Sequence, residues 1–433
     1  MKHKGLVIAL SILMFFVGVL GGAVGITYFT LPYNEELVVT SDVYYSMNDK
    51  STTVSVASGV QAPEEGAVAV HFLELGNKYT GDCTYIKVGE NIDILIDCGS
   101  KSNSVATVSN YLNQYVTDGT LEYVIVTHAH QDHYAGFATT TKIDSIFDLY
   151  ECENIITFAT TNQKTSTEYV TSSTSDYEVS SFGITSYAPS SKLASTMYAN
   201  FNRELSDEVE AGATHLTVMD ILNDGTTYPD GKITLDATNN ITMQILDSYY
   251  YNTEAHTEND YSVCTLISQG EKHFIFTGDL EADGEEELVK RNNLPQVELY
   301  KAGHHGSKTS STLTLLNVIK PKIVCICCCA GSSEYTKTEA NQFPTEIFIE
   351  NISRFTTQVY VTTLCVDYKN DQFTSFNGNI VVMAKKTDVE MSVYCSNNTI
   401  VLKDTDWFYQ NRYEMCKDAF DYNEISRQWL RTQ

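Results

Sequence analysis

The chain has 433 residues, enough for one large domain with attachments or for two smaller domains. Acidic residues outnumber basic ones by 55 to 28, which gives a net charge of −27. A surface of that charge repels a polyphosphate backbone, so we expect nucleic acid not to be the substrate. The hydrophobic content of 42% excludes a disordered chain.

The N-terminus predicts a membrane anchor. An apolar run from Gly5 to Phe29 follows Lys2 and Lys4, and it is longer than the ~20 residues that cross a bilayer. It also exceeds the ~7 to 15 residues of a secretory signal core. We therefore expect residues 1–30 to form a cytoplasmic tip and a single-pass signal-anchor transmembrane helix in the cell membrane, with the rest of the chain extracytoplasmic. A cleaved signal peptide, which would leave a secreted domain, is the alternative.

The next segments change from a stalk to a folded domain. Residues 31–66 are polar and predict a linker. From Ala67, the runs VAVHFLELG, CTYIKVG and DILIDCGS predict three short strands, and Ser104 to Val116 has helical spacing. A further strand, LEYVIV, follows, so the order predicts an α/β sandwich with helices on the outside. Residues 137–236 show less pattern and predict an insertion that covers the site and shapes the substrate pocket.

Two later strands end in candidate ligands. The run HFIFTGD ends at Asp279, and VELYKAGHHG ends at His304 and His305, with a predicted helix after each. The apolar run IVCICCCA predicts a central strand in which four of the eleven cysteines pack as small hydrophobic residues. Neighbouring strand residues point to opposite faces, which argues against the alternative of a thiolate metal cluster. Residues 386–433 predict a strand and helix extension.

The densest signal lies in LEYVIVTHAHQDHYAG. His128, His130 and His133, with Asp132, directly follow an apolar strand. A buried strand delivers its C-terminal end to a crevice, and imidazole and carboxylate are preferred ligands of zinc and similar ions. The pattern therefore predicts a metal site at a strand end. A histidine-rich exposed loop without a ligand is the alternative.

The motifs LIDCGS, THAHQDHYAG, FTGDLE and KAGHHGS, in that order, resemble those of the metallo-β-lactamase fold superfamily. The GHHGS form is similar to the hydrolase domain of competence DNA-uptake proteins and to teichoic acid phosphorylcholine esterases. The resemblance covers about residues 67–385 and implies a four-layer αββα sandwich. Its implied cofactors are two divalent metal ions, with zinc expected and manganese as the alternative.

The resemblance also implies six metal ligands: His128, His130, Asp132, His133, Asp279 and His305. In this pattern His128 and His130 hold one ion. Asp132 and His133 hold the other, and Asp279 bridges the two. Such a pair of ions, ~3.5 to 4 Å apart, activates water and clamps the oxygens of a displacement.

Further roles follow from the same resemblance. His305, or as the alternative His304, would complete the first ion's site. Asp132 and His304 are the candidate catalytic residues, with His304 facing the substrate and stabilising or protonating a phosphoryl oxygen. Asp97, at the end of DILIDCG, would orient a ligand histidine.

One position departs from the family. Many relatives have a metal-binding histidine in a His-Pro pair beyond the cysteine-rich strand, where this chain has Phe343 and Pro344. The second ion is therefore expected to bind weakly, to lack a protein ligand, or to recruit His256 or Asn341.

The leading interpretation is a membrane-anchored extracytoplasmic hydrolase of phosphodiesters or phosphoesters. A small molecule or a cell-envelope polymer would be its substrate, and the N-terminal helix would contact the membrane. A nuclease linked to DNA uptake is one alternative, although the net charge opposes it. A non-catalytic surface module with a degenerate metal site is the other, motivated by Phe343.

Overall fold

The structure, a computed structural model, describes residues 63–140, 142–163, 185–186 and 196–431. The predicted membrane anchor and almost all of the predicted stalk lie outside these residues. Within them, no helix combines the length and the apolar character that a bilayer crossing requires.

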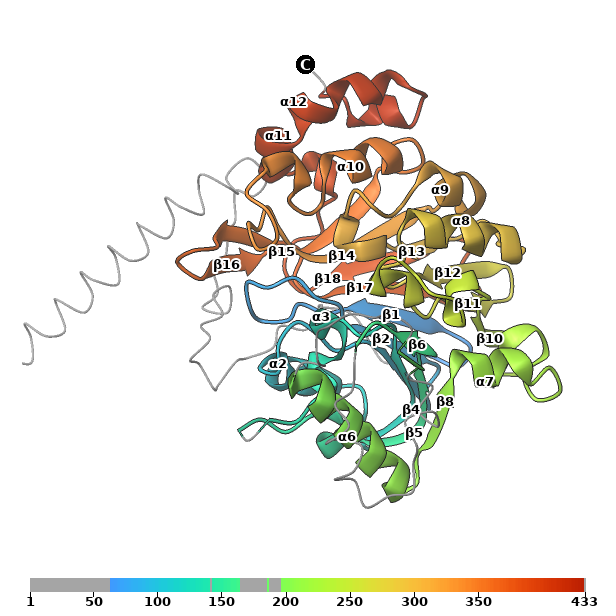
Figure 1. The fold of residues 1–433 in the computed structure, drawn as a ribbon. Helices are drawn as coiled ribbons and strands as arrows, with labels where there is room; N and C mark the ends of the chain where they lie inside the picture. Colours follow the sequence, from blue (N-terminus) through green and yellow to red (C-terminus); the bar gives the residue numbers. More distant parts are fainter. Residues whose placement is uncertain (1–62, 141, 164–184, 187–195, 432–433) are drawn as a thin grey trace, which may run out of the picture.

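Two eight-stranded sheets form the centre of the molecule (Figure 1). The first has the order β18-β17-β1-β2-β3-β4-β5-β8, and the second has the order β16-β15-β14-β13-β12-β11-β10-β9. The strands of the first sheet are β1 (Val68–Phe72), β2 (Thr84–Val88), β3 (Ile92–Ile96), β4 (Thr120–Val126), β5 (Glu151–Thr157), β8 (Thr214–Thr217), β17 (Ile380–Ala384) and β18 (Ser392–Cys395). Those of the second are β9 (Lys232–Asp236), β10 (Ile241–Ile245), β11 (Thr265–Gln269), β12 (Lys272–Phe276), β13 (Leu299–Lys301), β14 (Ile323–Ala330), β15 (Gln358–Asp367) and β16 (Gln372–Ser375). A small parallel pair joins β6 (Thr160–Thr161) and β7 (Thr185–Ser186).

Helices cover the outer face of each sheet. In Figure 1, α2 and α6 lie to the left of β4 and β5 in the lower part of the view, and α8, α9 and α10 lie above the strands of the second sheet. The helices are α2 (Ser104–Leu112), α3 (Gln131–Tyr134), α4 (Ile146–Leu149), α6 (Thr196–Ala211), α7 (Val218–Asn223), α8 (Ala282–Arg291), α9 (Leu313–Ile319), α10 (Glu346–Ile352), α11 (Asp406–Asn411) and α12 (Tyr413–Cys416). The predicted mixed α/β fold with two sheets is confirmed.

The core between the sheets combines side chains from both. Val70 of β1 and Ile94 of β3 share one buried cluster with Met243 of β10 and Phe274 of β12. A second buried cluster lies under α8, α9, α10 and the C-terminal helices. Burial of these side chains at about 25 cal/mol per Å² of apolar surface is the main force that holds the layers together.

Both sheets change from antiparallel to parallel pairing at the point where the candidate site begins. Strands β3, β4, β5 and β8 run parallel in the first sheet, and β12, β13, β14 and β15 run parallel in the second. Parallel strands present their carboxyl ends at one edge, so loops from successive strands meet there.

The region expected to be an insertion builds part of both sheets. Strands β5 and β8 extend the first sheet beyond β4, and β9 forms an edge of the second. Helix α6 packs beside α3 and α4, close to the histidine motif. Residues 137–236 therefore hold core strands as well as covering helices, and the rest of this region lies outside the described residues.

The cysteine-rich strand β14 is buried along its whole length. Cys325 and Cys327 face the core between the sheets, whereas Cys328 packs in the outer cluster under the helices. This alternation is what a strand buried on both faces produces. All eleven cysteines lie in the described residues and are free thiols.

Candidate metal centre

Strand ends from the two sheets bring the predicted ligands together. In the first sheet, Asp97 follows β3 and His128 comes two residues after β4. In the second sheet, Asp279 follows β12, and His305 lies in the η7 turn (Gly303–Gly306) after β13. The four side chains are buried, each with at most 1% exposure.

Asp279 is the point on which three histidines converge. Its Oδ2 atom lies 3.2 Å from His133 Nε2, 3.3 Å from His305 Nε2 and 3.7 Å from His304 Nε2. Its backbone N–H donates to Ser262 Oγ at 3.1 Å, which fixes the turn after β12. A single carboxylate thus reaches side chains from both sheets, as a bridging ligand would.

His128 and His130 form a second group beside this one. His128 Nε2 lies 3.0 Å from His130 Nδ1, and the rings are 4.8 Å apart. Two ring nitrogens at that separation can ligate one ion together. Burial lowers the pKa of His128 well below its usual value, and the neighbouring His133 and His130 add to the effect. The neutral imidazole, which is the ligating form, is therefore favoured.

Asp97, the residue expected to orient a ligand histidine, lies beside His133. Its Oδ2 atom lies 2.7 Å from His133 Nδ1, so Nε2 is left facing Asp279. Thr127 donates to the carboxylate twice, from N–H at 2.8 Å and from Oγ1 at 2.7 Å. Such carboxylate partners fix the tautomer and the direction of a ligand histidine.

Asp82 takes the matching position beside His305. His305 Nδ1 lies 3.1 Å from Asp82 Oδ1 and donates to the carbonyl oxygen of Cys327 at 3.0 Å, so Nε2 again faces Asp279. The Lys301 ammonium, only 3% exposed, forms an ion pair with Asp82 and lies 3.9 Å from Asp279 Oδ1. Neither Asp82 nor Lys301 was singled out from the sequence.

Asp132 lies on the open side of the cluster. Its Oδ2 atom is 3.6 Å from His305 Nε2 and accepts a hydrogen bond from the Tyr335 hydroxyl at 3.0 Å. A Cβ atom on Gly99 would lie 1.6 Å from the Asp132 carbonyl oxygen, so glycine is needed where these two loops meet. His305 was expected to complete the first ion's site, whereas the structure places it beside Asp132 and with its ring 5.3 Å from that of His133, the pair expected to hold the second ion.

The other residues discussed for that ion lie apart from it. Phe343 packs its ring 5.9 Å from that of His305, so it lines the site with carbon atoms. His256 is exposed, and Asn341 ends the short η8 turn (Glu339–Asn341). In the described part of the chain, neither is an ion-pair or hydrogen-bond partner of the cluster.

Glu258, which the sequence also left unmarked, supports the histidine motif. Its Oε1 atom accepts hydrogen bonds from Ala129 N–H at 3.2 Å and from Thr161 Oγ1 at 2.8 Å. Burial raises the pKa of Glu258 to about 7. A buried carboxyl that binds the backbone between His128 and His130 has no local sequence signal, because its partners are 129 and 97 residues away.

The backbone is strained at three of the predicted residues. Asp97, His304 and His305 have φ angles of 59°, 46° and 55°, in the left-handed region. For residues other than glycine this conformation costs about 1 to 3 kcal/mol each, and such strain concentrates at functional sites. The turn of the GHHG motif thus fixes the directions of two adjacent histidine side chains.

Buried polar atoms of the cluster indicate which kind of ligand it fits. His133 Nε2, His305 Nε2 and Asp279 Oδ1 are buried and, among the residues that the structure describes, none of them makes a hydrogen bond of suitable geometry, although both nitrogens lie close to Asp279 Oδ2. Such groups cost about 1 to 3 kcal/mol each when left unmet. One potential ligand atom from each of Asp82, His133, Asp279 and His305 lies within 4.8 Å of the other three. Nitrogen and carboxylate donors at this spacing fit a divalent metal ion.

The charge balance of the cluster supports this fit. Burial alone would lower the pKa values of His133 and His305. The nearby carboxylates outweigh burial and raise both pKa values well above the usual one, with Asp279 as the largest opposing influence. The cluster thus holds an excess of buried negative charge that attracts cations: protons when no metal is bound, and a metal ion in their place.

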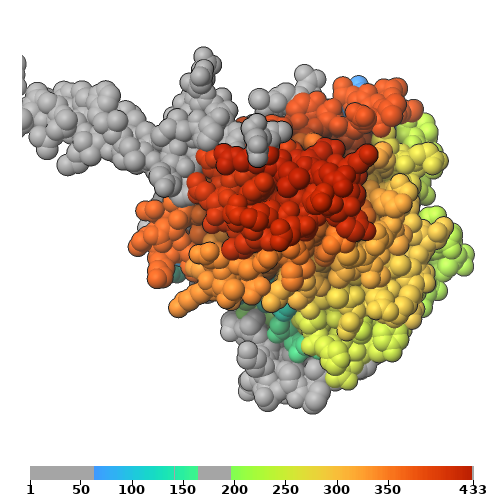
Figure 2. Space-filling view, turned by 90° about the horizontal axis from the view of Figure 1, so that it is seen from above, coloured from blue at the N-terminus to red at the C-terminus, as the bar shows by residue number. Residues whose placement is uncertain are grey.

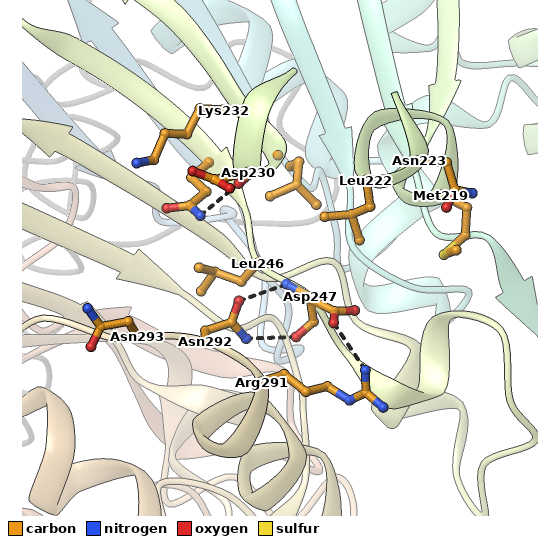
Figure 3. A pocket seen from close by; sticks show the side chains of 13 residues that line it. Met219, Leu222, Asn223, Asp230, Lys232, Leu246, Asp247, Arg291, Asn292 and Asn293 are labelled. Carbon is orange, nitrogen blue, oxygen red and sulfur yellow. Dashed lines mark hydrogen bonds and ion pairs between the residues drawn. The ribbon is translucent and has the colours of Figure 1, made fainter. Parts of the chain in front are cut away.

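A separate pocket of about 620 Å³ lies between α7, the β10 end and the α8 end (Figure 3). Its lining includes no member of the cluster. Three of its polar residues pair with each other: Arg291 Nη1 lies 3.1 Å from Asp247 Oδ2, and Asn292 exchanges two hydrogen bonds with the Asp247 backbone. Because these groups are satisfied, the cluster of buried histidines and carboxylates is the stronger candidate site.

Comparison with known families gives a match in two segments. Residues 76–143 and 252–330 match the family described as the metallo-beta-lactamase superfamily. The two segments contain the six predicted ligands, and also Asp82, Asp97 and Lys301.

Curated relatives match over short stretches. Recombination protein 2 of Haemophilus influenzae is 32% identical over 84 residues, which are 19% of this chain and 10% of that protein. ComE operon protein 3 of Bacillus subtilis is 35% identical over 72 residues, 16% of this chain and 9% of that protein. The matched stretches thus span about a tenth of the length of either relative.

The chain also matches solved structures at low sequence identity and low TM-score. The metallo-beta-lactamase fold protein YhfI from Bacillus subtilis is 12% identical, with a TM-score of 0.34, and the alignment covers 67% of this chain and 95% of that one. CmlA, a diiron beta-hydroxylase from Streptomyces venezuelae, is 10% identical, with a TM-score of 0.31, and the alignment covers 62% of this chain and 45% of that one.

Proposed function

From the metallo-β-lactamase fold that residues 76–143 and 252–330 carry, we propose that this protein is a metal-dependent hydrolase of phosphoesters, with phosphodiesters as the first substrates to test. One observation supports the proposal above the others. Buried histidine and carboxylate atoms that make no hydrogen bond of suitable geometry among the described residues converge on Asp279 from both sheets. Packing alone gives no reason to bury such groups together.

The side chains divide between two ions, with zinc as the first choice and manganese as the second. His128 and His130 would hold one ion, and His133 and His305 would hold the other together with Asp132. Asp279 would contact both. When bound, divalent ions supply Lewis acidity, which activates water and polarises a phosphoryl oxygen.

The remaining residues orient the substrate and move protons. His304 has a side chain that is 22% exposed, and its Nδ1 atom lies 3.2 Å from Thr309 Oγ1 and 3.4 Å from Glu281 Oε1. These contacts leave Nε2 directed at the cluster, where it can give a proton to a departing alkoxide. A histidine on the open side of the site suits this role better than a buried one.

The location of the reaction is part of the proposal. An apolar N-terminal run behind two lysines supports a membrane anchor, and the net charge of −27 disfavours nucleic acid. We therefore propose an extracytoplasmic phosphoester, such as a cell-envelope component, as the substrate.

The test uses the full-length chain in detergent, loaded with zinc or with manganese. We expect turnover of bis(p-nitrophenyl) phosphate that is lost in His130→Ala and kept in His256→Ala, a matched change at an exposed histidine outside the cluster. Absence of turnover with both ions would contradict the proposal and favour a non-catalytic module. Faster cleavage of single-stranded DNA than of small diesters would favour a nuclease.

A further inference from the structure

The segment 331–345, between β14 and α10, places two aromatic rings beside the cluster. Tyr335 is 58% exposed and donates a hydrogen bond to Asp132 Oδ2 at 3.0 Å. The ring of Phe343 lies 5.6 Å from that of Tyr335, 5.8 Å from that of His304 and 5.9 Å from that of His305. A phosphoryl group held at these histidines would therefore have its ester group within reach of both rings.

This segment is tied to the histidine turn on one side. Thr345 N–H donates to the carbonyl oxygen of Gly306 at 2.9 Å, and Gly331 N–H donates to that of Phe343 at 2.8 Å. A Cβ atom on Gly306 would lie 3.0 Å from Pro344 Cβ, so the two segments are in close contact. The Phe343 ring is thus held in register with His304 and His305.

Arg412 of the C-terminal extension holds the same segment from the other side. Its Nε donates to the carbonyl oxygen of Pro344 at 2.9 Å, and its Nη2 donates to that of Gln342 at 2.7 Å. The guanidinium also lies over the Trp407 ring, 4.9 Å from its centroid, and the residue is 1% exposed. Figure 2 shows the C-terminal segment, in red, as a cap over this part of the molecule.

The choice of arginine points to a positioning role. Burying a guanidinium costs several kcal/mol unless its donors are used, and these donors bind backbone carbonyls on both sides of Phe343. The planar fork of arginine can hold two such carbonyls at a fixed spacing, which lysine cannot do.

We propose that Tyr335 and Phe343, called here the aromatic wall, bind a planar ring on the organic group of the phosphoester, and that Arg412 is the positioning residue for this wall. The inference rests on the proposed hydrolase function and adds the substrate class, an ester that carries an aromatic ring. The C-terminal extension thereby takes part in substrate selection.

The test compares two substrates that share a leaving group. In bis(p-nitrophenyl) phosphate the ester group that stays on the phosphate carries a second ring, and in methyl p-nitrophenyl phosphate that group is a methyl. A ring contact contributes about 1 kcal/mol, or about five- to tenfold in affinity. We expect Phe343→Ala to lower kcat/KM about five- to tenfold for the two-ring ester, chiefly through KM, and less than about twofold for the methyl ester.

Arg412→Gln should shift the ratio of the two kcat/KM values in the same direction as Phe343→Ala. Phe343→Trp, which keeps an aromatic ring at this position, should have the ratio of the wild type. Arg354→Gln is the matched control, because Arg354 also contacts the extension, 4.3 Å from the Tyr422 ring, but lies outside the 331–345 segment. This control should leave the ratio unchanged. A thymidine ester with the same leaving group shows whether the favoured ring is a nucleobase or a simple aryl group.

A binding measurement without turnover completes the test. In calorimetry, diphenyl phosphate should bind the wild type more tightly than diethyl phosphate, and Phe343→Ala should remove that difference at unchanged metal content by mass spectrometry. Equal losses for both esters, or a ratio that Arg354→Gln shifts as much as Arg412→Gln, would overturn the inference while the hydrolase proposal stands. A wild type that cleaves neither ester would instead contradict the proposed function itself.

Discussion

Two buried carboxylates, Asp97 and Asp82, support two histidines in the same way but are stabilised differently. Each lies beside the Nδ1 atom of a histidine whose Nε2 faces Asp279. Burial raises the pKa of Asp97, although His133 works against it. The pKa of Asp82 is lowered, since Lys301 and His305 together outweigh its burial.

The difference comes from the partner behind each carboxylate. Thr127 gives Asp97 two neutral hydrogen bonds, whereas Lys301 gives Asp82 a full positive charge. Neutral donors orient a carboxylate but compensate less of the cost of burying its charge. The same ligand geometry is therefore reached with a neutral partner, Thr127 from the first sheet, behind one carboxylate and a charged partner, Lys301 from the second sheet, behind the other.

The largest loss of activity is expected from a change at Asp279, which lies between the two supported histidines. Asp279→Asn removes the carboxylate that His133 and His305 both face. The activity should then be lost, whichever carboxylate orients each histidine. Lewis acidity contributes several kcal/mol, so turnover of bis(p-nitrophenyl) phosphate should fall by about 1,000-fold. Initial rates and metal content measure this, with the exposed Asp283→Asn as the control. A variant with normal metal content and rate would show that Asp279 is no ligand.

Lys301→Met tests the charged support directly. Without the ammonium, the buried Asp82 carboxylate loses its strongest positive partner and keeps only the nearby histidines in the metal-free protein, so the free energy of unfolding should fall by about 3 kcal/mol. Urea denaturation in the presence of a chelator measures it. Adding Asp82→Asn to Lys301→Met should recover much of the loss, because the buried charge that lost its ammonium partner is then gone. A Lys301→Met protein as stable as the wild type would show that the ion pair contributes nothing.

Asp82→Asn and Asp97→Asn, made singly, compare the two supports. Losing the carboxylate that orients a ligand histidine lowers metal affinity about 10- to 100-fold. We expect Asp82→Asn near the upper end of that range, because Lys301 is then an uncompensated cation beside the ion. Asp97→Asn should lie near the lower end, since Thr127 loses only neutral contacts. Competition with a chromogenic chelator gives both constants, and the reverse order would break the comparison.

Glu285 is a third buried carboxyl, and unlike Asp82 and Asp97 it supports no histidine of the cluster. It accepts hydrogen bonds from Ser311 N–H and Thr312 N–H at 2.6 and 2.7 Å, and burial raises its pKa to about 7. Between pH ~4.5 and ~7 the folded chain therefore keeps a proton that the unfolded chain has released. Its contribution to stability thus falls as pH rises through that window, by about 3 kcal/mol at most.

Glu285→Gln should flatten this part of the pH profile of unfolding, and Glu286→Gln, at an exposed neighbouring position, should leave it unchanged. Denaturation series at several pH values provide the measurement. A profile that keeps its slope in Glu285→Gln would assign the proton to another group.

The local sequence pattern identified Asp97 as a candidate orienting residue but did not identify Asp82. Asp97 ends an apolar strand within the LIDCGS motif, and that motif predicted it as an orienting residue. Asp82 stands in a loop before β2, and Lys301 is a single charge inside VELYKAG. A lysine in an otherwise buried strand was the available signal, but its meaning depends on a carboxylate from the other sheet.

Pairing between distant segments explains the remaining differences. The metallo-β-lactamase fold and the two-sheet α/β architecture were predicted from motif order and are confirmed. The part of residues 137–236 in the sheets was missed, since β8 has only four residues with one fully buried. Tyr335 was missed because its contact with Asp132 joins residues 203 positions apart.

The cluster takes its members from both sheets, and this has a mechanical consequence. Asp82, Asp97, His128 and His133 come from one layer, and Asp279, Lys301 and His305 come from the other. A metal ion bound between them would cross-link the two sheets. Heat resistance of the whole domain should then follow the concentration of free metal, so that a melting curve becomes a titration of the site.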